Sequence, residues 1–324
     1  AITGDILWSA GPATGANATA AAADHPYVAV NSMIYAMPSD VAMIANFGGG
    51  VVRNRAYIGD TGGNVWRIDM NDIDVNNWTV TLLATIQDPS GLPGDPSGLR
   101  KFLFPPDVVH DLNGYDAVLI GSGDREHPFD LTVVNRYYMF KDYGIGTTPS
   151  NSGMDEGDLF DATDNCIQVC TGATQTAAIN DLANASGWFI TLGTGERNVG
   201  SSVTLNNVTF FNTNQSTEGF NIDNPGDPIN VGGSCGSDLG VARQYQIRYD
   251  NAIAVVDQNV DGSLTEGDRV EIHPGGGYLP SPVPLTVIIN GTVHEGVLSG
   301  TEVSDPPGTL LGARLRKYWY KEFE

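Results

Sequence analysis

The stretch of residues 55–69, RAYIGDTGGNVWRID, constrains the fold more than any other part of this chain. β-Branched and aromatic residues fill positions 56–58 and 65–68, and the residues between these runs tolerate tight turns. The pattern predicts a β-hairpin, because Gly62 and Gly63 supply the positive φ that such a turn needs. Trp66 is too large for one hairpin to bury, so we expect further sheets stacked against it.

The composition favours an all-β fold with little helix. The 324 residues include 40 glycines and 18 prolines, which suit many short strands joined by turns. Residues 88–98 predict a surface loop and residues 176–184 one short helix. Besides the hairpin, apolar and β-branched runs predict strands at residues 6–8, 28–35, 41–44, 78–85, 117–121, 136–141, 188–192, 203–211, 244–248, 253–256, 270–273, 285–289 and 316–320.

Two weak internal repeats suit a propeller. TGDILW at 3–8 resembles TGGNVW at 61–66, and GSGDR at 121–125 resembles GTGER at 193–197. Their spacing exceeds a propeller blade of about 40–45 residues, so we expect blades that carry insertions. We interpret residues 1–324 as one domain with an insertion at about 150–186, cut from a longer precursor. Because the first strand lacks a preceding turn and partner, we expect the propeller to be incomplete or unusually closed on that side.

The net charge of −22, from 38 acidic and 16 basic residues, opposes binding to nucleic acid or to anionic membranes. Such a surface attracts cations, although most of the carboxylates must simply be solvated. No apolar run approaches the roughly 20 residues of a membrane-spanning helix, and we find no signal-peptide pattern within these 324 residues.

The three cysteines are too few for a disulfide scaffold. Cys166 and Cys170 lie four residues apart in a polar stretch without a neighbouring histidine, so a disulfide is favoured over a zinc site. Its loss should be mild, because so short a loop restrains little chain entropy. Cys235 is left free or pairs outside this sequence.

The strongest local signal for chemistry is DQNVDGSLTEGD at residues 257–268. Its spacing reproduces the order of oxygen ligands in an EF-hand calcium loop, with Gly262 at the sharp turn. We expect a strand–loop–strand site for Ca²⁺ rather than a helical hand, with weak, extracellular-type affinity because Asp268 stands where glutamate is usual. The alternative is a polar hairpin without an ion. The candidate ligands are Asp257, Asn259, Asp261, Ser263, Thr265 and Asp268.

Three other motifs favour structural roles. GSGDREHP at 121–128 could support acid–base chemistry, but a structural ion pair through Arg125 is the favoured interpretation. GGSCG at 232–236 fits the letters of a serine nucleophile elbow but lacks the strand before it and the helix after it. DLNGYD at 111–116 is expected to be a turn.

Several motifs together resemble the C-terminal domain of the PilY/PilC family of type IV pilus tip-associated proteins. They are GGNVWRID at 62–69, GSGDREHP at 121–128, NRYYMFKD at 135–142, GWFI at 187–190, GER at 195–197 and the Tyr318-Trp319 pair. The resemblance implies a modified β-propeller and a calcium-responsive, non-catalytic role in pilus extension, retraction and adhesion. It also implies pilus subunits or minor pilins as partners, a host or abiotic surface as a further one, and a location at the cell surface or in the periplasm.

Two alternatives remain. Trp8 and Trp66 each follow a Thr-Gly turn, which resembles the tryptophan-docking repeats of quinone-dependent dehydrogenases. Those propeller enzymes use many such repeats and a catalytic aspartate, whereas this chain has two repeats and no identifiable cofactor pocket. The second alternative is a surface propeller with a purely structural role.

Overall fold

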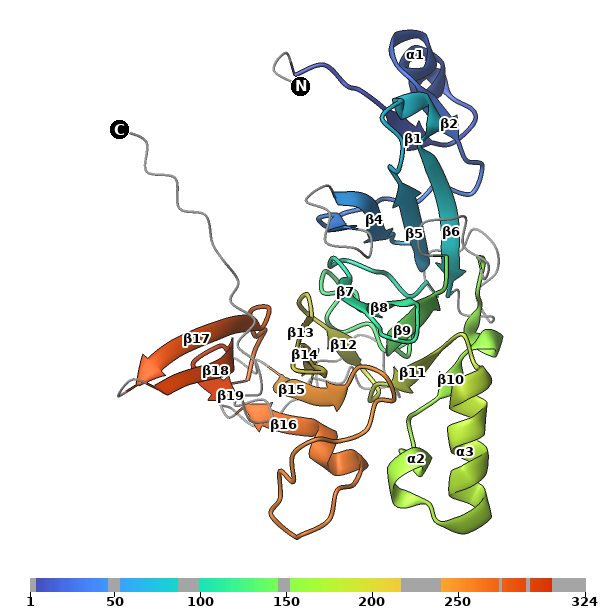
Figure 1. The fold of residues 1–324 in the computed structure, drawn as a ribbon. Helices are drawn as coiled ribbons and strands as arrows, with labels where there is room; N and C mark the ends of the chain where they lie inside the picture. Colours follow the sequence, from blue (N-terminus) through green and yellow to red (C-terminus); the bar gives the residue numbers. More distant parts are fainter. Residues whose placement is uncertain are drawn as a thin grey trace.

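The computed structural model describes residues 4–45, 53–86, 99–144, 152–216, 240–273, 276–289 and 292–304. Within these ranges the fold is mainly antiparallel sheet, as the composition predicts. Three meandering sheets follow one another along the chain and stack side by side (Figure 1). The described residues do not form seven or eight complete four-stranded blades, in line with an incomplete propeller.

Sheet 1 contains the predicted hairpin. Its order is β3 (Ala42–Ala45), β4 (Arg53–Gly59), β5 (Asn64–Asp69) and β6 (Thr79–Thr85), all antiparallel. Ile58 of β4 pairs with Trp66 of β5. Gly63 has φ +79°, and a Cβ there would lie 2.5 Å from the carbonyl oxygen of Ile86, so only glycine fits this turn.

Sheet 2 contains β7 (Asp107–His110), β8 (Asp116–Gly121), β9 (Arg136–Asp142) and β11 (Gly187–Thr191), with β10 (Phe160–Asp161) added in parallel at one edge. Sheet 3 contains β12 (Glu196–Asn198), β14 (Val208–Gln215), β15 (Val241–Arg248) and β16 (Val270–His273), while β13 (Val203–Leu205) also pairs with β14.

Strand β9 shows how the sheets stack, because it is buried on both faces. Alternate side chains of a strand point to opposite faces. Tyr138 and Phe140 pack into the core shared with sheet 1. Tyr137 packs into the core shared with sheet 3, where its ring stacks on Phe211 at a centroid distance of 3.7 Å. One strand thus contributes to two inter-sheet cores.

Other elements cover the two ends of this stack (Figure 1). At the sheet 1 end lie β1 (Ser9–Gly11), α1 (Ala16–Asp24) and β2 (Tyr27–Ala29), and Trp66 packs there against Met33 and Ile58, with Ala10 and Val30 beside them. The predicted burial of Trp66 is therefore confirmed, but against this N-terminal segment. At the sheet 3 end, β17 (Val283–Ile289), β18 (Thr292–Ser299) and β19 (Glu302–Ser304) form a further antiparallel sheet.

Several predicted strands were wrong in extent. Residues 6–8 form no strand, and the run at 28–35 ends as β2 at Ala29, since Met33 N–H turns back to the carbonyl of Val30. The run at 203–211 divides at Asn206 and Asn207, whose positive φ makes a tight turn. The run at 253–256 supplies only an isolated bridge between Ile247 and Ala254. The predictions for residues 88–98 and 316–320 lie outside the described residues.

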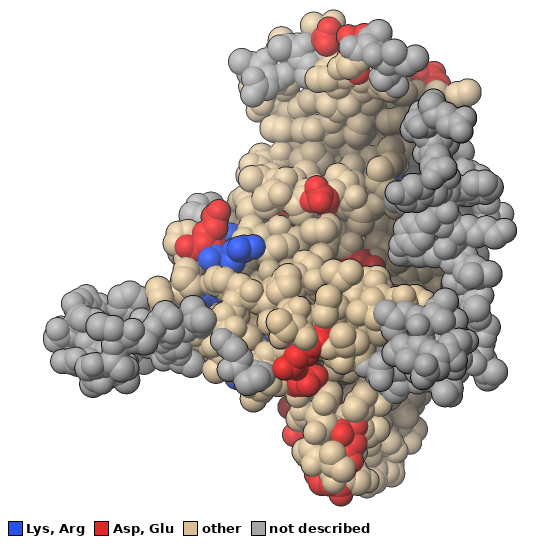
Figure 2. Space-filling model, turned by 90° about the vertical axis from the view of Figure 1, so that its left-hand side faces the viewer, with Lys and Arg blue, Asp and Glu red and all other residues tan. Residues whose placement is uncertain are grey.

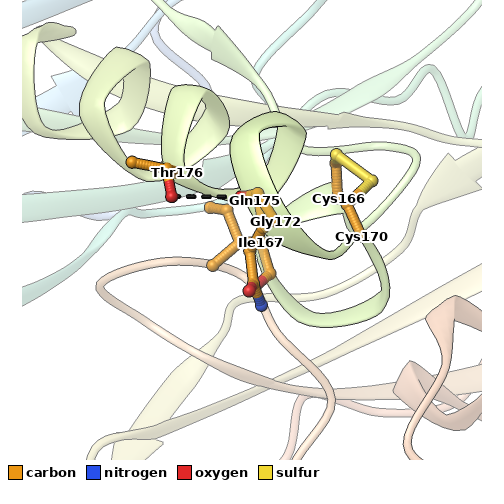
Figure 3. Close-up of a disulfide and its surroundings, with 6 residues drawn as sticks. All are labelled: Cys166, Ile167, Cys170, Gly172, Gln175 and Thr176. Atoms are coloured by element: carbon orange, nitrogen blue, oxygen red, sulfur yellow. Dashed lines mark hydrogen bonds between the residues drawn. A yellow bond between two sulfur atoms is a disulfide. The ribbon is translucent and has the colours of Figure 1, made fainter.

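Residues 152–186 carry most of the helix in the described part of the chain. They contain η3 (Glu156–Asp158), α2 (Cys166–Val169) and α3 (Gly172–Asn184), so the predicted helix begins four residues earlier than expected. The Cys166–Cys170 disulfide is confirmed and links the two ends of the α2 turn (Figure 3). The two remaining short helices within the described ranges are η1 (Val75–Asn77) and η4 (Glu266–Arg269). Cys235 lies outside the described residues. Among the described helices, none has the length and apolar character needed to cross a bilayer.

Candidate functional site

The candidate calcium loop, residues 257–268, lies between β15 and β16 and projects from sheet 3 (Figure 1, orange). The chain enters it after the Ile247–Ala254 bridge and leaves it through η4 directly into β16. The predicted strand after the loop is confirmed, whereas the strand before it is replaced by an irregular segment. The loop is therefore anchored to the sheet firmly on its C-terminal side.

The first three candidate ligands curl around the loop backbone. Asp257 accepts hydrogen bonds from the N–H groups of Asp261 (3.2 Å) and Gly262 (2.8 Å). Asn259 Oδ1 accepts from Asp261 N–H at 2.9 Å, and Asp261 Oδ1 accepts from both N–H and Oγ of Ser263. Gly262 has φ +88° and open space around it, as the sharp turn at this position requires.

Asp268 has a different environment from the other carboxylates, because its side chain is fully buried. Its Oδ1 accepts from the N–H groups of Gln258 (3.0 Å) and Asn259 (3.4 Å), and its Oδ2 from Thr265 N–H and Oγ1 (2.8 Å each). These four contacts use about all the lone pairs that a carboxylate offers. Asp268 thus clasps the two ends of the loop together.

The oxygen atoms of the loop meet the coordination needs of calcium in part. Ca²⁺ takes six to eight oxygens from carboxylates, amides, carbonyls and water. Asp257, Asn259 and Asp261 keep free lone pairs, and the carbonyl of Ser263 can join them, but Asp268 would have to give up a backbone hydrogen bond to ligate. Nowhere in the described ranges do three or more His, Cys, Asp or Glu side chains gather as a metal cluster. A calcium site here would use two carboxylates and several neutral oxygens.

The hydrogen bonds to Asp268 predict an acid-labile loop. Hydrogen bonds from backbone N–H groups, above all that of Thr265, lower the pKa of Asp268. A lowered folded-state pKa stabilises the fold above the unfolded value near 3.9, and this contribution is lost as pH falls through the folded pKa. The midpoint of thermal unfolding, measured at several pH values from 5 to 2, should therefore fall less steeply with decreasing pH in Asp268→Asn than in the wild type. Equal slopes would contradict this role.

A second polar cluster surrounds an open cavity of 260 Å³ lined by Lys101, Asp124, His127, Asp130 and Arg197, among others. Asp124 pairs with Lys101 and with His127 Nδ1, the latter at 2.8 Å. Burial opposes the charge on Asp124, yet the hydrogen bonds from Lys101 and His127 lower its pKa overall. The carboxylate is thus held ionised by its partners, which suits a structural ion pair better than a proton-transfer group.

The ion pair predicted through Arg125 is wrong, because Asp124 makes the ion pair of the GSGDREHP motif, with Lys101. The Arg125 guanidinium instead lies over the rings of Phe104 (5.8 Å) and Tyr278 (5.6 Å). Arg197, from the echoing GTGER motif, donates to the carbonyls of Asp124, His127, Asp130 and Gly195. The two motifs therefore meet in space, and together they fix the loop between β8 and β9.

The remaining sequence motifs add no chemistry. Asp111 forms the predicted turn, since its Oδ1 accepts from Asn113 N–H at 2.6 Å. The GGSCG motif lies outside the described residues. On the face drawn in Figure 2, acidic side chains lie in several separate groups, while Lys and Arg gather mainly at one place. This distribution suits a solvated acidic surface.

Comparison with known proteins bears on the fold. No protein-family model and no curated protein sequence matches this chain. The crystal structure of the Pseudomonas aeruginosa PilY1 C-terminal domain matches with a TM-score of 0.54 and 16% sequence identity, over 83% of this chain and 60% of that one. The chain thus spans about 60% of the solved structure that it matches. The resemblance predicted from the sequence motifs is confirmed in three dimensions: this chain has the β-propeller-like fold of the PilY1 C-terminal domain.

Proposed function

We propose that this chain is a calcium-binding, non-catalytic domain of a type IV pilus-associated protein. It would act in pilus biogenesis, in the balance of extension and retraction, and in surface adhesion. The fold shared with the PilY1 C-terminal domain supports the association with pili. The observation that carries the calcium proposal is the projecting loop, in which Asp257, Asn259 and Asp261 offer oxygens in the order of a calcium loop.

We propose that the site holds the loop in a closed conformation. The carboxylates of half-buried Asp257 and exposed Asp261 repel each other, and a bound calcium ion would neutralise that repulsion. Asp268 holds residues 258 and 259 against Thr265 whatever the exposed ligands bind, so the loop closes onto η4 and β16. Ordering at the tip is thereby connected to a strand of sheet 3. We propose that calcium binding thereby changes the surface that pilus subunits contact.

Calcium should raise the melting temperature of the wild-type protein but not that of Asp257→Ala. Binding to the folded state alone stabilises by about 2.7 kcal/mol at a hundredfold excess over the dissociation constant. Asp257→Lys places a cation in the loop, so it should melt higher than Asp257→Ala without calcium and show no response to the ion. Thermal unfolding with calcium and with chelator measures both effects. Identical responses in the wild type and Asp257→Ala would show that the loop is only a hairpin.

The function is tested in cells that carry the full-length protein. Asp257→Ala should change the number of surface pili, and that number should no longer respond to external calcium. Asp74→Ala is the matched control, because Asp74 lies in another exposed acidic loop and accepts from Asn76 N–H at 3.0 Å. If pilus number in Asp257→Ala follows calcium as in the wild type, the proposed role is wrong.

The proposal extends to partners and location. Pilus subunits or minor pilins are the proposed partners, with a host or abiotic surface as a further one. The place of action would be the cell surface or the periplasm, where the Cys166–Cys170 disulfide would persist. The absence of catalysis is part of the proposal, and absorbance spectra of purified protein that reveal a bound quinone would contradict it.

A further inference from the structure

Helix α2 and the residues just before it lie beside the candidate calcium loop and contact the chain at both of its ends (Figure 1). On the entry side, Gln168 Nε2 donates to the carbonyl of Ala254 at 3.2 Å, and Gln168 Oε1 accepts from the N–H of Ala254 at 3.1 Å. On the exit side, the guanidinium of Arg269 donates to the carbonyls of Thr163 (3.0 Å) and Ala162 (2.8 Å). One short segment thus holds both ends of the loop.

These contacts lie close to the first and the last candidate ligand. Ala254 precedes Asp257 by three residues, and Arg269 follows Asp268 directly. The entry side depends more on these contacts than the exit side does, because Ala254 forms an isolated bridge to β15 whereas the exit leads straight into β16. The two hydrogen bonds from Gln168 therefore help to position the chain that leads to Asp257.

The position of Gln168 depends in turn on the Cys166–Cys170 disulfide, which joins the first residue of α2 to the residue that ends it (Figure 3). Helix α2 has four residues, far fewer than the roughly 12 that an isolated helix needs. It follows Asn165, which has a φ of +51° and does not cap the turn with its side chain. Asn165 Nδ2 instead donates to Gln168 Oε1 at 2.7 Å. The disulfide thus supplies a restraint that the turn lacks by itself.

We propose that the Cys166–Cys170 disulfide controls how firmly the calcium loop is closed, acting through Gln168. The consequence for calcium affinity rests on the proposed function. Both cysteines are half-buried, so a small thiol reductant can reach them. A dithiol transfers two electrons and two protons to the disulfide: its own sulfurs join in a cyclic disulfide, and the protein is left with two cysteine thiols. Helix α2 then loosens, and the loop binds calcium more weakly.

Hydrogen–deuterium exchange without calcium tests control of the loop separately from ion binding. Gln168→Met keeps the size of the side chain and removes both hydrogen bonds to Ala254. Exchange across residues 254–262 should therefore become roughly tenfold faster than in the wild type. Thr176→Ala is the matched control, because Thr176 Oγ1 donates within α3, to the carbonyl of Gly172 at 3.1 Å (Figure 3). It should exchange like the wild type over these residues.

The disulfide itself is tested by the double variant Cys166→Ser with Cys170→Ser and by the wild type treated with dithiothreitol. Both should show the faster exchange of Gln168→Met across residues 254–262. Their melting temperatures should change little, because so short a loop restrains little entropy of the unfolded chain. The expected effect is thus local. Wild-type exchange rates at these residues in the double variant would overturn the proposal.

Calcium titration of the same proteins shows whether this control reaches the ion. The dissociation constant should rise about threefold to tenfold in Gln168→Met and in the double cysteine variant. If the wild type binds no calcium, the proposed function fails, and faster exchange in the double variant still supports control of the loop by the disulfide. If the wild type binds calcium and the double variant binds it equally tightly, this inference fails and the proposed function stands.

Discussion

Asp60→Ala should destabilise the fold by roughly 4 kcal/mol, the largest loss expected from any single substitution in the 55–69 hairpin. Asp60 is fully buried. Its carboxylate accepts from Gly62 N–H (2.8 Å), Asn64 N–H (3.0 Å), Asn64 Nδ2 and Trp66 Nε1 (2.8 Å). Removing it leaves all these donors without an acceptor, each at a cost of about 1–3 kcal/mol.

Urea unfolding of Asp60→Ala, Asp60→Asn and the wild type measures this effect. Asp60→Asn keeps one acceptor oxygen, so its midpoint should fall between those of the other two. Asp72→Ala is the matched control, because Asp72 also accepts two short hydrogen bonds within a turn but is exposed. Its midpoint should stay close to that of the wild type. A midpoint for Asp60→Ala within error of the Asp72→Ala value would contradict the assigned role.

The second large effect is expected at the seam between sheets 1 and 2. Arg67 of β5 donates to Asp142 of β9 at 2.8 Å and to Asp69 at 2.8 Å, while Tyr57 donates to Asp142 at 2.6 Å. Arg67, Asp142 and Tyr57 are fully buried. Asp142→Ala leaves the Arg67 guanidinium with one fewer buried counter-charge, so the free energy of unfolding should fall by about 3–5 kcal/mol.

Two controls distinguish the destabilisation caused by an uncompensated buried charge from that caused by a general loss of contacts. Arg67→Met combined with Asp142→Leu removes both charges and should recover much of the stability lost in Asp142→Ala. Arg248 and Asp250 form an ion pair of the same 2.8 Å length on the surface, so Asp250→Ala should cost at most about 1 kcal/mol. Equal losses in Asp142→Ala and Asp250→Ala would show that burial of the seam does not matter.

The sequence predicted the sheets well where they are buried. The hairpin at 56–68 and the doubly buried strand β9 follow from local pattern, because apolar, aromatic and β-branched residues fill most of their positions. Errors came where turn chemistry competes with strand propensity, as at Asn206 and Asn207. Short polar strands such as β12 (Glu196–Asn198) escaped notice, since tertiary contacts and not propensity place them in the sheet.

The candidate site was only partly predictable. Spacing placed Asp257, Asn259 and Asp261 around one turn, as the structure shows. The burial of Asp268 could not be read from spacing, because it depends on η4 folding against β16. Likewise, Asp60 gave no sequence signal beyond turn propensity, although it organises the hairpin. Both carboxylates act through backbone N–H groups, which a sequence pattern does not reveal.

Isothermal titration of the purified protein with calcium decides whether residues 257–268 bind the ion. We expect one saturable site per chain with a dissociation constant of roughly 10⁻⁵–10⁻³ M. The site should be absent in Asp257→Ala and retained in Asp74→Ala. A wild-type protein that shows no saturable calcium binding, or an Asp257→Ala variant that binds as tightly as the wild type, would contradict a calcium site in this loop.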